Sequence, residues 1–237
     1  MSQSYFIWKG IDCRSMGVVL QGPIPIIRPE ERVKHTEIPG RSGDLTELEG
    51  EEIYNSYIQT ATIMVHGGYR VREIYNWLKG AGFVTFHGEP DRKQAARIIG
   101  AITLNKHSRN LDWWVGEMQF YCQPLKQLLT EVPVTITSSG SAVMNTGDVE
   151  SRPRITATAS GTSLTITVGG KTLTISGLTS GNDYIIDSEI MEVSNADRSV
   201  LLTENSQGNF PRMAPGSNTI TGSGWSRLVI DRRERFL

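Results

Sequence analysis

Alternation of apolar and polar residues with a period of two recurs along most of this chain, and this is the pattern of strands. Residues 53–65 alternate in this way and predict one long strand. Residues 164–168 and 173–175 alternate on either side of a turn-like Gly-Gly-Lys at 169–171, which predicts a β-hairpin. We therefore expect a mainly β protein.

One segment departs from this period. Val71, Ile74, Tyr75 and Leu78 share one helical face, and Gly80 suits a left-handed helix end. We expect a single helix over residues 70–79. Further strands are expected at residues 83–86, 95–104, 113–122, 184–193, 199–203, 218–221 and 225–231.

The composition changes sharply at about residue 135. Between residues 135 and 185, 26 of 51 residues are Ser, Thr or Gly and six are charged, whereas the preceding segment is rich in aromatic and charged residues. This shift indicates a domain boundary at residues 129–133. We expect a β-rich first domain over 1–130, with its helix laid against a sheet, and a β-sandwich over 131–237.

Charge and targeting signals narrow the classes of function. The formal net charge of -1 gives no overall field to hold a polyanion, so nucleic-acid binding is not expected as the main activity. No segment has the apolar length of a membrane span, and the start lacks a secretory signal, so we expect folding in the cytoplasm. Cys13 and Cys122 are interpreted as small buried apolar residues, because that compartment is reducing.

Two motifs that suggest catalysis fail at particular positions. Gly170-Lys171-Thr172 is similar to part of a phosphate loop, but Thr165 stands where the first glycine is required. The residues after Thr172 also alternate as a strand, whereas a phosphate loop needs a helix there. Gly40-Arg41-Ser42-Gly43 lacks the spacing of a nucleophile elbow, and we interpret it as a tight turn.

The clusters of ionisable residues do not indicate a site either. The histidines are 31, 21 and 20 positions apart, without the short spacing of paired metal ligands: His35, His66, His87 and His107. Glu49, Glu51 and Glu52 are interpreted as a solvated loop rather than an acid–base pair. The Arg-Arg-Glu-Arg run at 232–235 is interpreted as a solvated strand end or as an ion-pairing contact with a neighbouring subunit. We expect no enzyme activity, cofactor or metal.

Three tryptophans remain as candidates for contact with a ligand or a partner. Trp225 begins the last alternating strand, where an inward-facing core ring is favoured over an exposed platform for glycans. Trp113 and Trp114 are neighbours in a strand, so their rings point to opposite faces. We expect one of them in the core and the other toward a partner subunit.

Several local patterns, taken in order, resemble the siphophage distal tail protein family, also called phage tail component proteins. The first domain has Gly10-Ile11-Asp12-Cys13, Met16-Gly17-Val18, the turn Pro39-Gly40-Arg41-Ser42-Gly43 and the closing Phe120-Tyr121-Cys122-Gln123-Pro124. The second has Asn145-Thr146-Gly147, Ser151-Arg152-Pro153-Arg154-Ile155, Tyr184-Ile185-Ile186-Asp187 and Phe210-Pro211 followed by Pro215-Gly216-Ser217-Asn218. The matches span nearly the whole chain, and Gln123 stands where the family often has lysine.

The resemblance implies a structural virion protein at the tip of a long, non-contractile tail of a phage or prophage, assembled in the host cytoplasm without membrane insertion. Residues 1–130 would form a homohexameric ring, and residues 131–237 a galectin-like sandwich on its rim. The ring would join the tail tube protein to the tail-tip fibre or tail-associated lysin and the receptor-binding proteins. The tape measure protein and then DNA would pass through its lumen.

Two other functions stay open at this point. A carbohydrate-binding accessory tail protein would contact host-surface glycans through the Ser/Thr-rich sandwich and Trp225. A hydrolase is the weakest alternative, because no nucleophile, base and orienting group can be named together. For the hub, the near-neutral charge predicts a lumen without a continuous Arg and Lys lining, since such a lining would retain the passing DNA.

Overall fold

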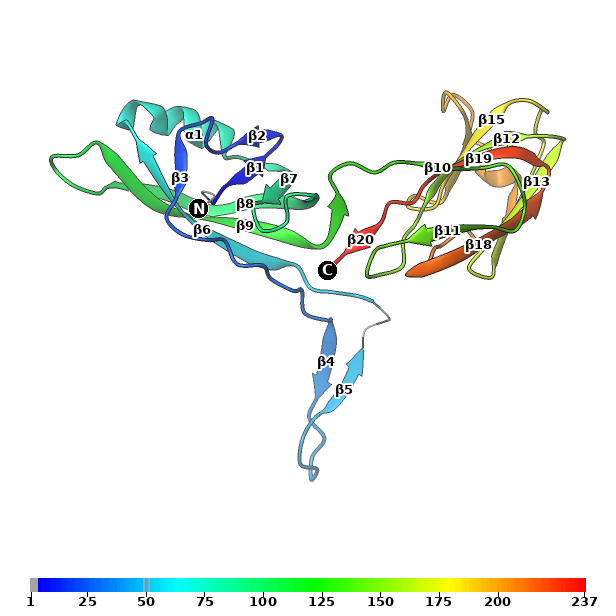
Figure 1. The fold of residues 1–237 in the computed structure, drawn as a ribbon. Helices are drawn as coiled ribbons and strands as arrows, with labels where there is room; N and C mark the ends of the chain where they lie inside the picture. The colour runs from blue at the N-terminus through cyan, green and yellow to red at the C-terminus, as the bar shows by residue number, and fades with distance from the viewer. Residues whose placement is uncertain (1–3, 49, 51) are drawn as a thin grey trace. The chain divides into compact units, whose positions relative to one another are not determined.

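The computed structural model describes residues 4–48, 50 and 52–237 (Figure 1). The chain is mainly β with one α-helix, as the sequence predicts. It forms two compact units, Met1–Leu129 together with Leu237, and Thr130–Phe236. Within the described residues, no helix has both the length and the apolar character needed to span a bilayer.

The first unit is built on one antiparallel sheet. Its strands are β1 (Phe6–Trp8), β2 (Ile11–Asp12), β3 (Val18–Leu20), β6 (Tyr57–His66), β7 (Ala81–Phe86), β8 (Arg92–Lys106) and β9 (Trp113–Leu128). They lie in the order β2-β1-β7-β8-β9-β6-β3. A 3-10 turn, η1 (Gly68–Arg70), leads into the helix α1 (Val71–Trp77). Strands β4 (Val33–Thr36) and β5 (Leu45–Leu48) pair only with each other, and they lie apart from the main sheet (Figure 1).

The core of the first unit lies between one face of this sheet and α1. Phe120 of β9 is fully buried and contacts the rings of Phe6, Trp8 and Phe86 at centroid distances of 5.4, 5.6 and 5.5 Å. Phe6 also stacks on Trp77 at 5.8 Å, which fixes the helix to the sheet. Burial of each such ring contributes about 2 to 3 kcal/mol, so this aromatic cluster is the main anchor of the unit.

The helix lies where the sequence predicts it, while several strands have different limits, and the single strand expected at 184–193 is two strands, Asp183–Asp187 and Glu192–Asn195. The long strand begins at Tyr57 rather than at residue 53, and the preceding residues contribute only an isolated bridge at Tyr54. β9 continues through Pro124, where we had expected it to end. The register between β8 and β9 shifts between Cys122 and Lys126. Pro124 therefore lies in an irregular stretch, where a residue without an N–H interrupts no regular ladder.

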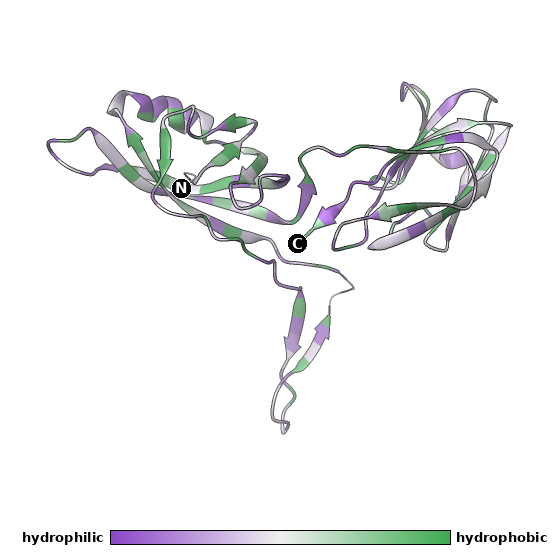
Figure 2. Cartoon of the chain, in the orientation of Figure 1, coloured by the Kyte–Doolittle hydropathy of each residue, from purple (hydrophilic) through white to green (hydrophobic). Residues whose placement is uncertain are grey.

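The second unit is a sandwich of two antiparallel sheets. Its elements are β10 (Val134–Ile136), β11 (Ser141–Asn145), β12 (Arg154–Ala159), β13 (Ser163–Val168), β14 (Lys171–Ser176), β15 (Asp183–Asp187), β16 (Glu192–Asn195), η2 (Thr203–Asn205), β17 (Ser206–Gly208), β18 (Gly216–Ser223), β19 (Trp225–Asp231) and β20 (Arg235–Phe236). One sheet has the order β10-β19-β12-β15-β16 and the other β11-β18-β13-β14-β17. Figure 2 shows hydrophobic and hydrophilic residues mixed along these strands. The buried aliphatic residues of both sheets form one core.

Turn chemistry explains one predicted element of the sandwich and one error. Gly169 and Gly170 both have positive φ, 57° and 73°, so β13 and β14 join in the predicted hairpin. The strand predicted at 199–203 is wrong. There the Asn195 side chain accepts a hydrogen bond from the Val200 backbone N–H at 3.0 Å, and Asp197 accepts one from the Ser199 N–H. These local bonds fold the segment into a loop.

Candidate assembly surfaces

The most exposed part of the first unit is the hairpin of β4 and β5, which we call the arm (residues 31–54). An isolated bridge between Glu31 and Tyr54 closes its base, and the Arg32 N–H donates to the Ile53 carbonyl at 2.8 Å. In the main ladder Val33 faces Leu48 and Thr36 faces Leu45. The arm is therefore a regular two-stranded ribbon.

The tip of the arm is the Gly-Arg-Ser-Gly segment that the sequence analysis interprets as a tight turn. Gly40 and Gly43 have φ of 82° and 83°, and the Arg41 N–H donates to the Ile38 carbonyl at 3.1 Å. Both glycines take the left-handed conformation that other residues rarely adopt, so the turn interpretation is confirmed.

The described residues of the arm form no core of their own. The side chains of β4 and β5 are all exposed except that of Val33, which is partly covered. Leu48 is 61% exposed and Ile38 38%. A two-stranded ribbon is at best marginally stable in water, and exposed aliphatic side chains on it favour contact with another surface. The arm is thus the segment best suited to hold a second molecule.

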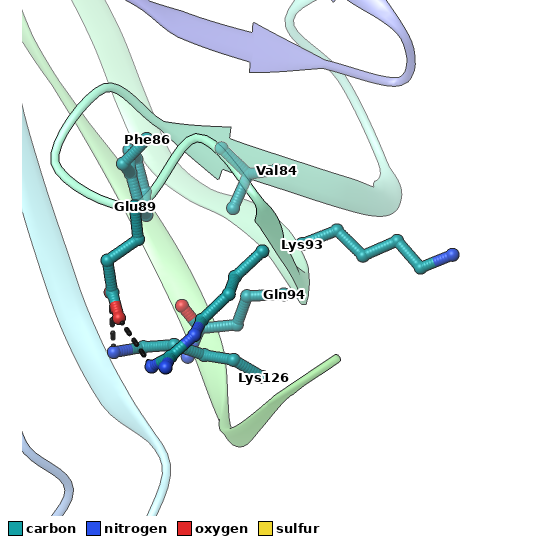
Figure 3. Close-up of a pocket in the computed structure, with 7 residues that line it drawn as sticks. Val84, Phe86, Glu89, Lys93, Gln94 and Lys126 are labelled. Atoms are coloured by element: carbon teal, nitrogen blue, oxygen red, sulfur yellow. Dashed lines mark hydrogen bonds and ion pairs between the residues drawn. The ribbon is translucent and has the colours of Figure 1, made fainter. Parts of the chain in front are cut away.

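A polar cluster on the first unit joins the turn after β7 to β9 (Figure 3). Glu89 accepts hydrogen bonds from Arg92 Nη1 at 3.0 Å and from Lys126 Nζ at 2.6 Å. The Lys126 side chain is only 5% exposed. The adjoining cavity has a volume of about 10 Å³, room for roughly one water molecule. The cluster thus ties two segments together and leaves no space for a substrate.

Gln94 extends this network into the sheet. It accepts a hydrogen bond from the Tyr57 hydroxyl at 3.0 Å and donates one to the Gln123 carbonyl at 2.5 Å. Burial raises the pKa of Tyr57 to about 12, so its hydroxyl stays protonated and remains a donor. The neutral side chains of Tyr57 and Gln94 therefore join the start of β6 to β8 and β9.

Trp225, the candidate for glycan contact, lies in the core of the sandwich. Its side chain is 9% exposed and belongs to the same cluster as Leu164 and Leu228. Its indole N–H has no hydrogen-bond partner among the described residues. A ring in this position presents no open face on which a sugar could stack.

The adjacent tryptophans lie on opposite sides of β9. Trp114 packs against the core cluster, and its indole N–H donates to Asp112 at 2.9 Å. Trp113 lies beside His66, with ring centroids 5.0 Å apart. Trp114 is thus the ring nearer the core, although it is only partly buried, and a contact of Trp113 with a partner subunit stays a prediction.

The remaining candidates for chemistry lie apart from one another. Lys171 opens β14 in the hairpin, and the four histidines fall on or beside β4, β6, β7 and β8. Glu52 is exposed, while Glu49 and Glu51 lie outside the described residues. Across the part of the chain that the structure describes, no three His, Cys, Asp or Glu side chains are placed to hold a metal ion.

The interpretation of residues 232–235 as a solvated end is wrong. Arg233 makes a bidentate pair with Asp187 at 2.7 and 2.8 Å, and Arg235 pairs with Glu189. The Arg233 guanidinium lowers the pKa of Asp187 against the opposing effect of burial. These cations are held within their own unit by Asp187, which ends β15, and by Glu189 in the turn that follows it.

Arg232 lies among several acidic side chains, with which it forms ion pairs. The Glu234 side chain is fully buried and accepts hydrogen bonds from the Thr146 backbone N–H at 2.7 Å and hydroxyl at 2.9 Å. Arg232 Nη1 lies 3.0 Å from Glu234. Burial, with Asp231 nearby, raises the pKa of Glu131 to about 7. One carboxyl of this cluster therefore titrates near neutrality.

The arm is the candidate assembly element that sequence reasoning missed. Residues 33–36 and 45–48 carry polar and apolar side chains on both faces of the ribbon, so no buried face gives the alternation typical of a strand. The available signal was the Pro-Gly-x-x-Gly turn with β-branched or aliphatic residues on each side.

Comparison with known proteins gives a match at the level of the fold. No protein-family model matches the chain, and no curated protein matches its sequence. Among solved structures, the crystal structure of SPP1 Dit superposes with a TM-score of 0.77 over 100% of both chains at 19% identity. That protein is described as a paradigm of the hub adsorption apparatus in phages that infect Gram-positive bacteria. The chain thus has the fold of a phage tail hub protein.

Proposed function

We propose that this chain is a structural distal tail protein of a long, non-contractile phage or prophage tail. Two independent lines support the proposal. The family patterns in the sequence span nearly the whole chain, and the fold matches SPP1 Dit over its full length. In this role the chain needs no active site, because its work is to hold other tail proteins in place.

The arm is the observation that carries the proposal. It leaves its own unit with exposed aliphatic side chains and without a core. When the same arm of every copy contacts the same surface of the next copy, the contacts are head-to-tail, and a rotation that closes gives a ring. The ring would be a homohexamer formed by the first unit, with the sandwich on its rim.

The hub would join the tail tube protein on one side to the tail-tip fibre or tail-associated lysin and the receptor-binding proteins on the other. The tape measure protein and DNA would pass through its lumen. Because a polyanion releases counterions wherever it meets lysine and arginine, a passage for DNA works best without a continuous basic lining. A solved ring whose lumen is lined throughout by Arg and Lys would contradict this role.

Light scattering of the purified chain tests the proposal most directly. We expect a particle of sixfold the 26.3 kDa mass of the chain, and a ring in electron micrographs. The measurement is repeated over a range of protein concentrations, because ring closure by weak contacts depends on concentration. A monomer at every concentration would argue against self-assembly through the arm.

A further inference from the structure

We infer that the arm tip of one copy docks into a basic-rimmed groove on the main sheet of the next copy, held by opposite charges around an apolar contact. The inference rests on the proposed function and adds the identity of the receiving surface and the force that selects it. It follows from how charge is distributed within the first unit.

The arm and the body of the first unit carry opposite charge. Residues 31–54 contain seven acidic and three basic residues: Glu31, Glu37, Asp44, Glu47, Glu49, Glu51 and Glu52 against Arg32, Lys34 and Arg41. The rest of residues 1–129 contains seven acidic and twelve basic residues. The formal charges are therefore -4 for the arm and +5 for the body, although the whole chain is almost neutral. Such a division favours contact between one copy's arm and another copy's body.

The body has a broad groove with an apolar floor. It lies across β7, β8 and β9, has a volume of about 620 Å³ and is lined in part by Phe83 and Tyr121. Both rings are unusually open to solvent, with exposed fractions of 46% and 41%. Ile58 of β6 is 49% exposed and lies opposite Tyr121 in the ladder, which extends the apolar strip.

Cations surround this floor. Arg97 lines the groove between Ala81 and Tyr121, its cross-strand neighbours. The Lys93 ammonium lies 5.4 Å from the centre of the Phe83 ring. Lys9 reaches over the same edge and donates to the Lys79 carbonyl at 2.7 Å. The described residues that line the groove include no acidic side chain.

The arm tip has the complementary arrangement. Ile38, which is 38% exposed, lies on the turn between Glu37 and Asp44, and all three line one small hollow with Arg41. An aliphatic side chain flanked by carboxylates thus faces an aromatic floor flanked by Lys93 and Arg97. Arg41 is the one cation on this turn, and the exposed Tyr121 ring offers it a cation–π partner.

The occupant of the groove is a second copy rather than the chain's own arm. β4 and β5 form a sheet of their own, and Figure 1 shows the arm directed away from the main sheet of its unit. An arm that leaves its own body reaches the equivalent groove of a neighbour, and the contact repeats from copy to copy.

Reversing the charges of the groove and of the arm tip distinguishes a contact held by opposite charges from one held by apolar burial alone. We expect Lys93→Glu with Arg97→Glu to weaken association about tenfold or more, and Glu37→Lys with Asp44→Lys to do the same. A chain carrying all four changes should recover most of the association. Lys171→Glu, a single charge reversal in the sandwich hairpin, serves as control for a change of charge outside the contact. Association of the unmodified chain should also weaken as salt is raised.

A cysteine pair tests the contact itself. Protein carrying Ile38→Cys is mixed with protein carrying Phe83→Cys under mild oxidation, and a mixed disulfide dimer is expected. Met144→Cys, at an exposed position of the sandwich, replaces Phe83→Cys in the control and should give no such dimer. The native thiols do not interfere, because both are buried.

The outcomes distinguish the groove from the hub. Rings that withstand the Lys93 and Arg97 reversal, with no disulfide between positions 38 and 83, would overturn the groove while leaving the hub intact. An unmodified chain that stays monomeric, together with no mixed disulfide between the two cysteine variants, would overturn both. Loss of association by each double reversal, recovery in the fourfold variant and the specific disulfide would together establish the inference.

Discussion

Single residues of the second unit set its response to pH. The pKa of Glu131 is raised from an ordinary value of 4.5 to about 7, mainly by burial and then by Asp231. The folded chain therefore keeps a proton that the unfolded chain loses above about pH 4.5. The stability that this proton contributes is fully present at lower pH and is lost as the pH rises through about 7.

We expect Glu131→Gln to remove this dependence, because the amide needs no proton to lie beside Asp231. At about pH 8 the variant should be more stable than the native chain by about 1 kcal/mol, and at about pH 4 the two should agree. Denaturant unfolding of the second unit at both pH values measures this difference. Glu204→Gln, at an exposed glutamate, is the control, and an equal gain there would contradict the assignment.

Trp225 gives a second test at the residue scale. Because its ring is part of the sandwich core, Trp225→Ala should destabilise the second unit by about 3 to 5 kcal/mol. Calorimetric titration of the native chain with host-surface glycans should show no saturable binding at this residue. Saturable binding that is lost in Trp225→Ala under conditions where the variant is folded would instead favour the carbohydrate-binding alternative.

The burial of single residues was easier to predict from the sequence than the pairing of one side chain with another. The alternation around Trp225 indicated its interior position from its neighbours in the chain alone, and Cys13 was interpreted as a small buried apolar residue. The pairing of Arg233 with Asp187 needed the fold, because the two residues are distant in sequence and meet only when the sheet brings the segment after β19 to the end of β15.

At the scale of elements, the arm should be dispensable for folding and required for assembly. Residues 32–53 can be replaced by a short Gly-Ser linker, because the bridge between Glu31 and Tyr54 already brings the two ends together. We expect the melting temperature of the remaining chain to change little, since the arm contributes nothing to the core. Light scattering should then give a monomer. Association that survives the replacement would show that other surfaces hold the copies together.

Elements were predictable where a local signal defines them. The β13–β14 hairpin follows from two glycines between alternating strands, and α1 follows from a change of period. The arm escaped prediction because neither face of the ribbon is buried, so its order depends on the turn and on what it contacts. The extension of β9 through Pro124 escaped because it depends on a register shift against β8.

At the scale of the whole molecule, the two units have separate hydrophobic cores. We expect calorimetry to resolve two unfolding transitions, since neither core contributes residues to the other. Trp225→Ala should lower the transition of the second unit and leave that of the first unchanged. Equal shifts of both transitions would mean that the units unfold as one cooperative body.

Cys13 and Cys122 are both buried and unpaired. Burial raises the pKa of the Cys122 thiol to about 12 and also raises that of Cys13. At neutral pH Cys122 is therefore almost entirely in the thiol form, whereas the thiolate is the form that oxidants attack. The two thiols of a particle built from this chain would therefore stay reduced after release into air, and no disulfide would record the redox history of its surroundings.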